Sequence, residues 1–314
     1  MQAIILTEAG NNFGLGHLSR CTALKNFLQK VNFNVEIYNR GDFISDNCIN
    51  FNWLAESEAK KLESILKNKP LVIIDSYYAN FEFCKYLVDN AKVCVFFDDF
   101  SRMKYPRGAI IFNGALNASK YYIDVENTIF SGIEYGLLRN EFLQREVKTI
   151  NKDITRVLIA LGGNDYNNNT QKVLEIIEKE IVYADIDVVV SNKHKPLNYG
   201  FNTNIHSNIS ARVLKNLMLD CDLAISGGGV TMVELQSTCT PTIALEIASN
   251  QSYQLRAWQK VGLRVANNTY QIKSLLKTLK KLKDRNKLHN KLLKINIGEK
   301  IGEFIQYLVD KYNS

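Results

Sequence analysis

RVLIAL at 156–161, followed at once by GGND at 162–165, is the stretch that decides the fold of this chain. It is typical of a buried strand that runs into a glycine-containing loop, and QAIILT at 2–7 begins the chain in the same way. After each of these starts, apolar strands alternate with helical patterns, which indicates a parallel sheet with helices on its faces. We therefore predict an α/β protein with two doubly wound, Rossmann-like domains that face each other across a cleft.

The segment 141–153 is charged and polar, and we interpret it as the linker between the two domains. The length of 314 residues also predicts two domains, at about 150 residues per domain. We expect one Rossmann-like domain over 1–145 and a second over 154–290. The last segment, 291–314, carries one apolar stripe at helical spacing, so we expect a helix there that packs back on the N-terminal domain.

Hydrophobic periodicity predicts the individual elements of both domains. Strands are predicted over 2–7, 34–38, 71–75, 93–99, 109–113, 156–161, 187–191, 222–226 and 241–246. Helices are predicted over 17–29, 54–67, 81–90, 170–183, 211–219 and 230–238.

The composition excludes several classes of protein. With 46% hydrophobic and 23% charged residues, the chain is neither disordered nor fibrous. No apolar run approaches the ~20 residues that span a bilayer, and the N-terminus lacks the features of a signal peptide, so we expect a cytoplasmic protein. The cysteines have no C-x-x-C spacing, which predicts reduced thiols rather than disulfides or a zinc site. They are Cys21, Cys48, Cys84, Cys94, Cys221 and Cys239.

The net charge of +7 comes from one segment, 273–300, which has ten Lys or Arg and two acids and is therefore +8. Leucines alternate with these basic residues, whereas a nucleic-acid surface would need aromatic stacking positions. We interpret the segment as an amphipathic helical stretch with a solvated basic face and expect no nucleic-acid partner. A peripheral membrane contact is the less favoured alternative.

Ligands of open α/β sheets bind beyond the carboxyl ends of the strands, and the first candidate there is GLGHLSR at 14–20. Its glycines allow a sharp turn and a close approach to a ligand. His17 falls at the start of the following helix, where the positive end of the helix dipole keeps an imidazole neutral and able to accept a proton. This favours a general base. The alternative is a histidine that caps the helix or hydrogen-bonds in the core.

Two glycine loops in the second half are candidate phosphate sites. SGGGVT at 226–231 leads from a strand into a helix, whose free N–H groups could hold a diphosphate without a metal. Glu234 follows in the first turns of that helix, where a carboxylate could accept hydrogen bonds from a ribose. GGND at 162–165 could close over the phosphates from the opposite side. The alternatives are a close-packed turn and a simple polar turn.

Polar residues at three further strand ends suggest a sugar pocket. DSY at 75–77 and DD at 98–99 could bind hydroxyls or amides, or orient His17 through its other ring nitrogen. Helix capping and a surface turn are the alternatives, and the adjacent acids point to opposite faces, so we expect no joint metal site. NQ at 250–251 could bind a sugar through its amides, or Asn250 could cap the next helix.

Taken together, these motifs resemble one family. G-x-G-H-x-x-R, D-x-Y, DD, GG-N-D, G-G-x-T-x-x-E and a late N-Q occur in this order over about residues 1–265. The chain thus resembles the UDP-sugar hydrolase of pseudaminic acid biosynthesis, which is similar in turn to two-domain (GT-B) glycosyltransferases. It departs from the family in having Val230 where a serine is frequent, and in its basic C-terminal extension.

The positions at the strand ends and this resemblance together predict the site residues. We expect His17 as the catalytic base, with Tyr77 beside it in the catalytic group. The residues expected around the sugar are Gly16, Arg20, Asp75, Asp99, Asn250 and Gln251. The residues expected around the nucleotide are Gly163, Asn164, Ser226, Gly228, Gly229, Val230, Thr231 and Glu234.

The resemblance implies a specific reaction. Water, deprotonated by His17, would attack the anomeric carbon of a UDP-linked 2,4-diacetamido-2,4,6-trideoxy sugar and release UDP with inversion. It implies no metal, no cofactor and a small-molecule UDP-sugar as the partner. One alternative is an inverting glycosyltransferase with an acceptor hydroxyl in place of water, which the basic stretch modestly favours. The other is a non-catalytic module that binds a nucleotide sugar.

Overall fold

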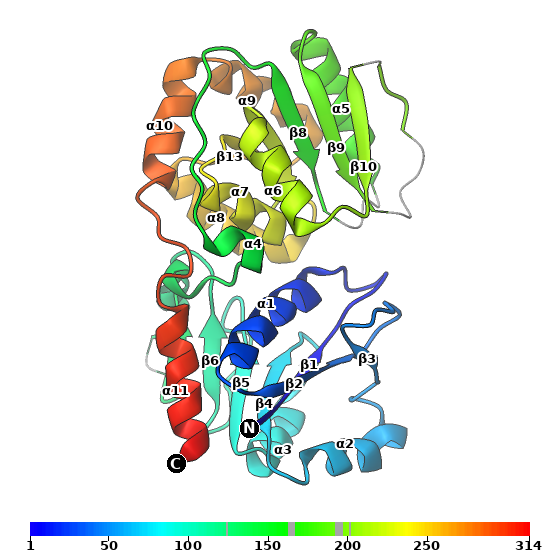
Figure 1. Ribbon diagram of the computed structural model, residues 1–314, viewed down its shortest axis with the longest axis vertical. Helices are drawn as coiled ribbons and strands as arrows, with labels where there is room; N and C mark the ends of the chain where they lie inside the picture. Colours follow the sequence, from blue (N-terminus) through cyan, green and yellow to red (C-terminus); the bar gives the residue numbers. More distant parts are fainter. Residues whose placement is uncertain (124, 163–166, 192–196, 201) are drawn as a thin grey trace. The chain divides into compact units, whose positions relative to one another are not determined.

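The structure is a computed structural model that describes residues 1–314 apart from 124, 163–166, 192–196 and 201 (Figure 1). The chain forms two compact units. Unit 1 consists of Met1–Arg139 together with Ile297–Ser314, and unit 2 consists of Asn140–Asn296. Each unit is built on its own parallel sheet, as the repeated strand–loop pattern predicts.

Unit 1 contains a seven-stranded parallel sheet with the order β3-β2-β1-β4-β5-β6-β7. Its strands are β1 (Gln2–Thr7), β2 (Asn34–Asn39), β3 (Ile49–Asn50), β4 (Leu71–Asp75), β5 (Val93–Phe97), β6 (Ile110–Asn113) and β7 (Thr128–Ser131). Its α-helices are α1 (Gly16–Lys30), α2 (Ala59–Leu66), α3 (Phe81–Asn90) and α11 (Ile301–Asn313). Its 3₁₀ turns are η1 (Glu56–Glu58), η2 (Ala118–Tyr121) and η3 (Ile133–Tyr135).

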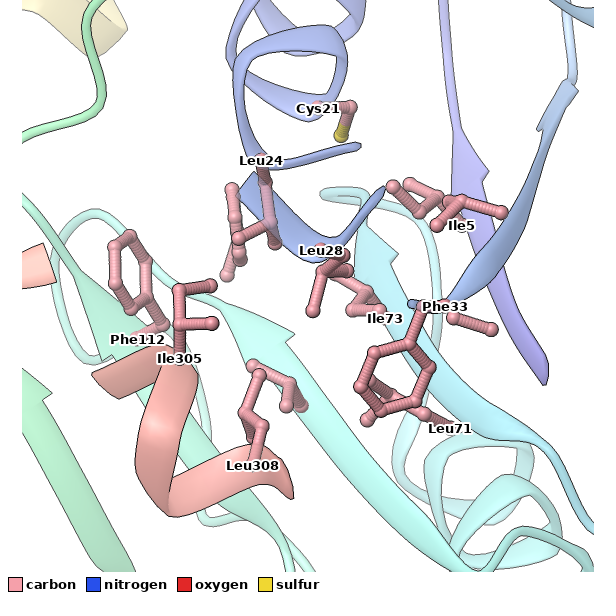
Figure 2. Close-up of a cluster of buried hydrophobic side chains, with 14 of the residues drawn as sticks. Ile5, Cys21, Leu24, Leu28, Phe33, Leu71, Ile73, Phe112, Ile305 and Leu308 are labelled. Carbon is pink, nitrogen blue, oxygen red and sulfur yellow. The ribbon is translucent and has the colours of Figure 1, made fainter. Parts of the chain in front are cut away.

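Both faces of this sheet are covered, which is why its central strands β1, β4 and β5 are apolar except at their ends. Ile5 of β1 belongs to the core that packs under α1 and α11, whereas its neighbour Ile4 belongs to the core under α2 and α3. Figure 2 shows the first of these cores, where side chains of α1 and α11 meet those of the central strands. Phe304 of α11 is fully buried, with its ring centroid 4.7 Å from that of Phe112.

The chain returns to unit 1 at Ile297, just before α11 begins, and Gly298 shapes this return. The N–H of Gly298 donates to the carbonyl of Ile133 at 3.0 Å, and that of Lys300 donates to Glu134 at 2.8 Å. Gly298 has a φ of +75°, and a Cβ there would lie 2.6 Å from the carbonyl oxygen of Gly136. Only glycine permits both this conformation and this close approach, so the return path depends on it.

Unit 2 contains a six-stranded parallel sheet with the order β10-β9-β8-β11-β12-β13. Its strands are β8 (Arg156–Ala160), β9 (Asp185–Val190), β10 (Thr203–Ser207), β11 (Leu223–Gly227), β12 (Thr242–Leu245) and β13 (Arg264–Ala266). Its α-helices are α4 (Asn140–Leu143), α5 (Asn169–Glu180), α6 (Ala211–Asp220), α7 (Val230–Ser237), α8 (Ser252–Val261), α9 (Ile272–Leu279) and α10 (Leu282–Leu292). Its 3₁₀ turns are η4 (Ser249–Gln251) and η5 (Thr269–Gln271).

The segment 141–153, which we predicted to be a linker, packs on unit 2 instead. The buried Nζ of Lys215 donates to the carbonyl oxygens of Glu141 at 2.8 Å and Gln144 at 3.1 Å, and forms an ion pair with Glu146. A buried ammonium group needs several acceptors, and the carbonyls of this polar segment provide them. Main-chain carbonyls and one carboxylate of the segment thus satisfy a buried charge of unit 2, and the units meet along the chain at 139–140 and 296–297.

The basic segment 273–300 also differs from the expectation of one amphipathic stretch. It contains two helices, α9 and α10, with a break at 280–281. Arg285 is not part of a solvated face, because it is fully buried and donates to the carbonyl oxygens of Leu279 at 2.7 Å and Lys280 at 3.0 Å. It thus caps the C-terminal end of α9.

Two further expectations concern the whole chain. All six cysteines are free thiols, as predicted. Among the described residues, no helix combines the length and the apolar character that crossing a bilayer requires.

Candidate active site

The candidate site of unit 1 lies where the strand order of its sheet reverses, beyond the carboxyl ends of β1 and β4. β1 pairs with β2 on one side and with β4 on the other. Open α/β sheets bind ligands at such a switch point. His17 lies in the first turn of the helix that follows β1, and Asp75 is the last residue of β4. Parallel pairing places Thr7 and Asp75 side by side, so both strands end at the same level.

A closed loop determines where His17 stands. Gly10 and Gly14 exchange backbone hydrogen bonds of 3.1 Å and 2.8 Å, which closes the loop between β1 and α1. Gly14 has a φ of +72°, a conformation that glycine adopts without strain. The helix begins directly after this loop, and the side chain of His17 keeps 11% of its surface exposed. The sequence motif therefore places a partly accessible imidazole at the strand exit, as predicted.

Asp75 orients this imidazole. Its Oδ1 lies 2.5 Å from Nδ1 of His17, and its carboxyl group is fully buried. Burial by itself would raise the pKa of Asp75, but the charge of Arg20, followed by that of His17, outweighs burial and holds this pKa well below its usual range. Asp75 is therefore an ionised acceptor, and Nδ1 of His17 is the donor. The lone pair then lies on Nε2, which is the arrangement of a general base.

Arg20 joins Asp75 to a second carboxylate. Its Nε donates to Asp75 at 2.6 Å, and its NH1 donates to Asp99 at 2.7 Å. Burial would raise the pKa of Asp99, and the charge of Arg20 overrides this effect and lowers it. Arg20 and Asp99, which we predicted to contact a sugar, pair with each other, and their side chains are 23% and 24% exposed, so the sugar contact stays a prediction. Arg20 thereby also holds the carboxyl group that contacts His17, through bonds from Nε and NH2 to Asp75.

Tyr77 completes this network. Its hydroxyl donates to Asp99, and the edge of its ring meets the ring of His17 at a centroid distance of 4.9 Å. Burial, together with the charge of Asp99, raises the pKa of Tyr77, so the phenol stays neutral. Asp98 points the other way and accepts from the backbone N–H of Arg102 at 3.1 Å. The two adjacent acids therefore have different partners, although β5 ends at Phe97 and the alternation of a strand does not extend to them.

Sequence reasoning missed Glu8, which directly follows β1. It is 1% exposed and accepts from the hydroxyl of Ser76 at 2.8 Å and from NH1 of Arg40 at 2.5 Å. Burial raises the pKa of Glu8, while the hydrogen bond from Ser76 and the charges of Arg40 and His17 oppose that rise. An acid immediately after an apolar strand was the signal that could have identified it, as it did for Asp75.

The glycine loop of unit 2 occupies the corresponding position after β11. β11 lies between β8 and β12 in the sheet, so this loop is also at a switch point. A Cβ on Gly228 would lie 2.8 Å from Cγ of Leu255, which shows how closely the backbone packs there. Gly229 is exposed and precedes α7 without a side-chain cap. The first N–H groups of a helix have no intrahelical partner, so those of Val230 and Thr231 are available to an anion.

Gln251 holds this loop in place. Its Oε1 accepts from the N–H of Gly228 at 3.1 Å and from that of Ile247 at 3.2 Å. We predicted Gln251 as a sugar ligand; its carbonyl oxygen orders the glycine loop, and the sugar contact stays a prediction. Asn250 lies beside it in the turn Ser249–Gln251.

Two predicted nucleotide ligands are buried. Ser226 and Glu234 have no exposed surface, and the hydroxyl of Ser226 donates to the carbonyl of Gly227 at 3.1 Å. A ribose could reach Glu234 only after local rearrangement. Gly163 and Asn164, predicted to contact phosphates, lie outside the described residues. Among the described side chains, no group of three or more His, Cys, Asp or Glu residues is arranged to hold a metal ion.

Two parallel α/β units of this kind define the two-domain glycosyltransferase (GT-B) fold. The glycosyltransferase SnogD from Streptomyces nogalater has a solved structure that matches 99% of this chain over 99% of its own, with a TM-score of 0.60 and 13% identity. This likeness shows the fold. The expected α/β class with two Rossmann-like sheets is therefore confirmed.

Relatives found by sequence show a more specific similarity than the fold does. The chain is 29% identical over 268 residues to the Helicobacter pylori protein named pseudaminic acid cytidylyltransferase and UDP-2,4-diacetamido-2,4,6-trideoxy-beta-L-altropyranose hydrolase. The match covers 84% of this chain and 48% of the relative, so the chain spans about half the length of that protein. It is also 24% identical to the spore coat polysaccharide biosynthesis protein SpsG of Bacillus subtilis, over 83% of this chain and 82% of that one. No protein-family model matches the chain. The resemblance to the UDP-sugar hydrolase, first indicated by the motifs, is confirmed.

Proposed function

We propose that the chain is a hydrolase that releases UDP from a UDP-linked 2,4-diacetamido-2,4,6-trideoxy sugar, by attack of water at the anomeric carbon with inversion. The observation that carries the proposal is the pair formed by His17 and Asp75 at the switch point of unit 1. The resemblance to the Helicobacter hydrolase supports the choice of substrate, because it extends over 84% of this chain.

In the proposed step, Nε2 of His17 takes a proton from water while the water oxygen forms a bond to the anomeric carbon. The bond between that carbon and the diphosphate oxygen breaks, and its electron pair leaves with UDP. His17 becomes a cation during this step, and the ionised carboxylate of Asp75 stabilises it. Arg20 keeps Asp75 ionised and oriented, and Tyr77 packs edge to face against the imidazole.

We propose that the leaving diphosphate is stabilised by the N–H groups of Gly229, Val230 and Thr231 at the start of α7. Such groups are fixed before the reaction, so they stabilise developing negative charge without reorganisation. The proposal uses no metal and no cofactor. Turnover should therefore persist when the protein is assayed in excess EDTA.

The test is an assay of UDP release with no acceptor present, run in oxygen-18 water. We expect UDP release, with the label in the free sugar and none in UDP. Label in UDP would mean cleavage of the P–O bond and would overturn the mechanism. A His17→Asn variant should lose most turnover and keep UDP binding; an unchanged rate would assign His17 a structural role.

A glycosyltransferase is the second candidate, favoured by the solved neighbour SnogD. Its nucleotide site would be the same, and an acceptor hydroxyl would replace water. UDP release that depends strictly on an added acceptor would select this candidate over the hydrolase. UDP binding without release under any condition would indicate a non-catalytic binding module.

A further inference from the structure

A second polar cluster lies at the switch point of unit 1, where β2, β1 and β4 end. β2, β1 and β4 lie next to one another and end in register, since Thr7 pairs with both Asn39 and Asp75. The residues just past these three ends are Arg40, Glu8 and Ser76, and their side chains are joined by hydrogen bonds through Glu8. Three neighbouring strands thus contribute one row of polar side chains beside the proposed base.

Two aromatic rings enclose the cation in this row. The guanidinium carbon of Arg40 lies 4.7 Å from the ring centroid of Tyr78 and 5.4 Å from that of Phe13. The two rings meet edge to face at 5.7 Å and 88°. We call Phe13, Arg40 and Tyr78 the Arg40 platform. Cation–π contacts and edge-to-face packing hold these groups in one arrangement.

The platform is ordered before any ligand arrives. Phe13 belongs to the loop that the reciprocal hydrogen bonds of Gly10 and Gly14 close. The guanidinium of Arg40 is anchored to the buried carboxyl group of Glu8. A preformed surface loses little conformational entropy when it binds a ligand.

The platform still offers groups that a ligand could use. Tyr78 is 58% exposed, and it directly follows Tyr77, whose ring contacts that of the proposed base. Within the part of the chain that the structure describes, Glu8 is the only hydrogen-bond acceptor of the Arg40 guanidinium, through NH1. Nε and NH2 therefore remain as donors beside the ring of the exposed Tyr78.

Guanidinium donors beside an aromatic ring are suited to bind a planar amide group. An amide carbonyl accepts hydrogen bonds from a guanidinium, and the flat amide with its methyl group can lie on an aromatic ring. A hydroxyl group has no such plane and no methyl group, so it gains less from the same surface. A site that is built to pair with a polar substituent discriminates against analogues that lack it.

We infer that the Arg40 platform is the subsite that recognises an N-acyl substituent of the substrate sugar, and that Tyr78 and Arg40 determine the preference for N-acylated over hydroxylated sugars. This inference rests on the proposed function, because it assigns a substituent of the same substrate. Neither residue takes part in the proton transfer, so their effect is on binding.

The test compares two ligands on each variant. In a His17→Asn background, calorimetry measures the affinity for the UDP-linked 2,4-diacetamido-2,4,6-trideoxy sugar and for its analogue with hydroxyls in place of both acetamido groups. Tyr78→Ala and Arg40→Lys should each reduce the preference for the acetamido ligand about tenfold. Tyr78→Phe keeps the ring and should retain the preference for the acetamido ligand. The control Tyr270→Ala removes a tyrosine of unit 2 that is 89% exposed, and it should also retain the preference.

Arg40→Lys keeps a positive charge beside the buried carboxyl group of Glu8. The ratio of the affinities for two ligands, measured on one variant, does not depend on the fraction of that variant that is folded. Equal affinity of the background protein for both ligands, or a ratio unchanged in both Tyr78→Ala and Arg40→Lys, would overturn the inference. The wild-type assay for UDP release is read separately. If the wild type releases UDP but the affinity ratio is unchanged in the variants, the hydrolase proposal holds and the subsite is wrong. If the ratio changes but the wild type releases no UDP, the subsite holds and the hydrolase proposal is wrong.

Discussion

Oδ1 of Asp75, the last residue of β4, lies 2.5 Å from Nδ1 of His17, in the first turn of α1. The two residues are 58 positions apart in the sequence, and the pairing of β1 with β4 brings them together. Asp75 is fully buried and ionised, so it selects the tautomer of His17 in which Nε2 can accept a proton.

The first prediction concerns the tautomer of His17. In Asp75→Asn, the amide can donate to Nδ1, which moves the ring proton to Nε2 and removes the proposed base. We expect turnover to fall by about 10²- to 10⁴-fold, with UDP affinity unchanged, as measured by UDP release and by calorimetry. Asp89→Asn removes an exposed acid of α3 and is the matched control. A normal rate in Asp75→Asn would contradict the assigned role.

A second prediction compares two adjacent glycines of the proposed phosphate loop. Ala at Gly228 would place its Cβ 2.8 Å from Leu255 and 3.0 Å from Gln251, so Gly228→Ala should lower the Tm and weaken UDP binding. Gly229→Ala has no atom nearer than 4.0 Å to the new Cβ and should leave the Tm unchanged. Its methyl group would nevertheless project at the start of α7, so UDP binding should still weaken. Unchanged UDP affinity in Gly229→Ala would remove this loop from the nucleotide site.

The third prediction tests the buried arginine of unit 2. Besides its two bonds to the end of α9, Arg285 donates through NH2 to the carbonyls of Asn151 at 2.8 Å and Lys152 at 2.7 Å. Arg285→Gln leaves several of these buried carbonyls without a donor, and we expect a loss of about 2–4 kcal/mol in the free energy of unfolding. Lys287→Gln, at an exposed position of the same helix, should change it by less than about 0.5 kcal/mol. Chemical denaturation measures both, and equal stability of the two variants would show that the buried bonds of Arg285 contribute little.

The fourth prediction is a dependence of the stability of unit 1 on pH. The pKa of Asp75 is lower in the folded state than in the unfolded state, where it is about 3.9. The unfolded state therefore binds more protons as the pH falls below about 5, and the stabilisation from Asp75 is progressively lost. Glu8, whose folded pKa is raised, acts in the opposite direction. We expect Asp75→Asn to lose stability less steeply than the parent between about pH 5 and pH 3.

Tryptophan fluorescence can isolate this effect. The chain has two tryptophans, Trp53 in unit 1 and Trp258 in unit 2. In a Trp258→Phe background, Trp53 reports on unit 1 alone during denaturation at each pH. Parallel stability curves for Asp75→Asn and its parent would show that Asp75 does not titrate differently in the folded state.

Local patterns in the sequence determined the central strands and the place of the candidate base. β1 and β4 have the predicted bounds, because strands buried on both faces are apolar throughout and polar residues mark their ends. The edge strands β3, β7, β10 and β13 went unrecognised. They have only two to five residues and less of their surface buried, so periodicity hardly distinguishes them from loops.

The partners of charged groups were decided by the tertiary structure alone. The sequence shows in which segment each polar residue lies, but it does not show the hydrogen-bond or ion-pair partner of that residue. This holds for Asp75, Asp99, Gln251 and Arg285. Arg20 of α1 pairs with Asp99, 79 residues away, and Glu8 pairs with Arg40, 32 residues away, because parallel strands bring their carboxyl ends, and the start of the helix after β1, to one edge. A hydrophobic pattern records which face of an element is buried, whereas an ion pair depends on the positions of two elements in space. The local pattern therefore located the strand ends, and only the folded sheet determined which residues act together there.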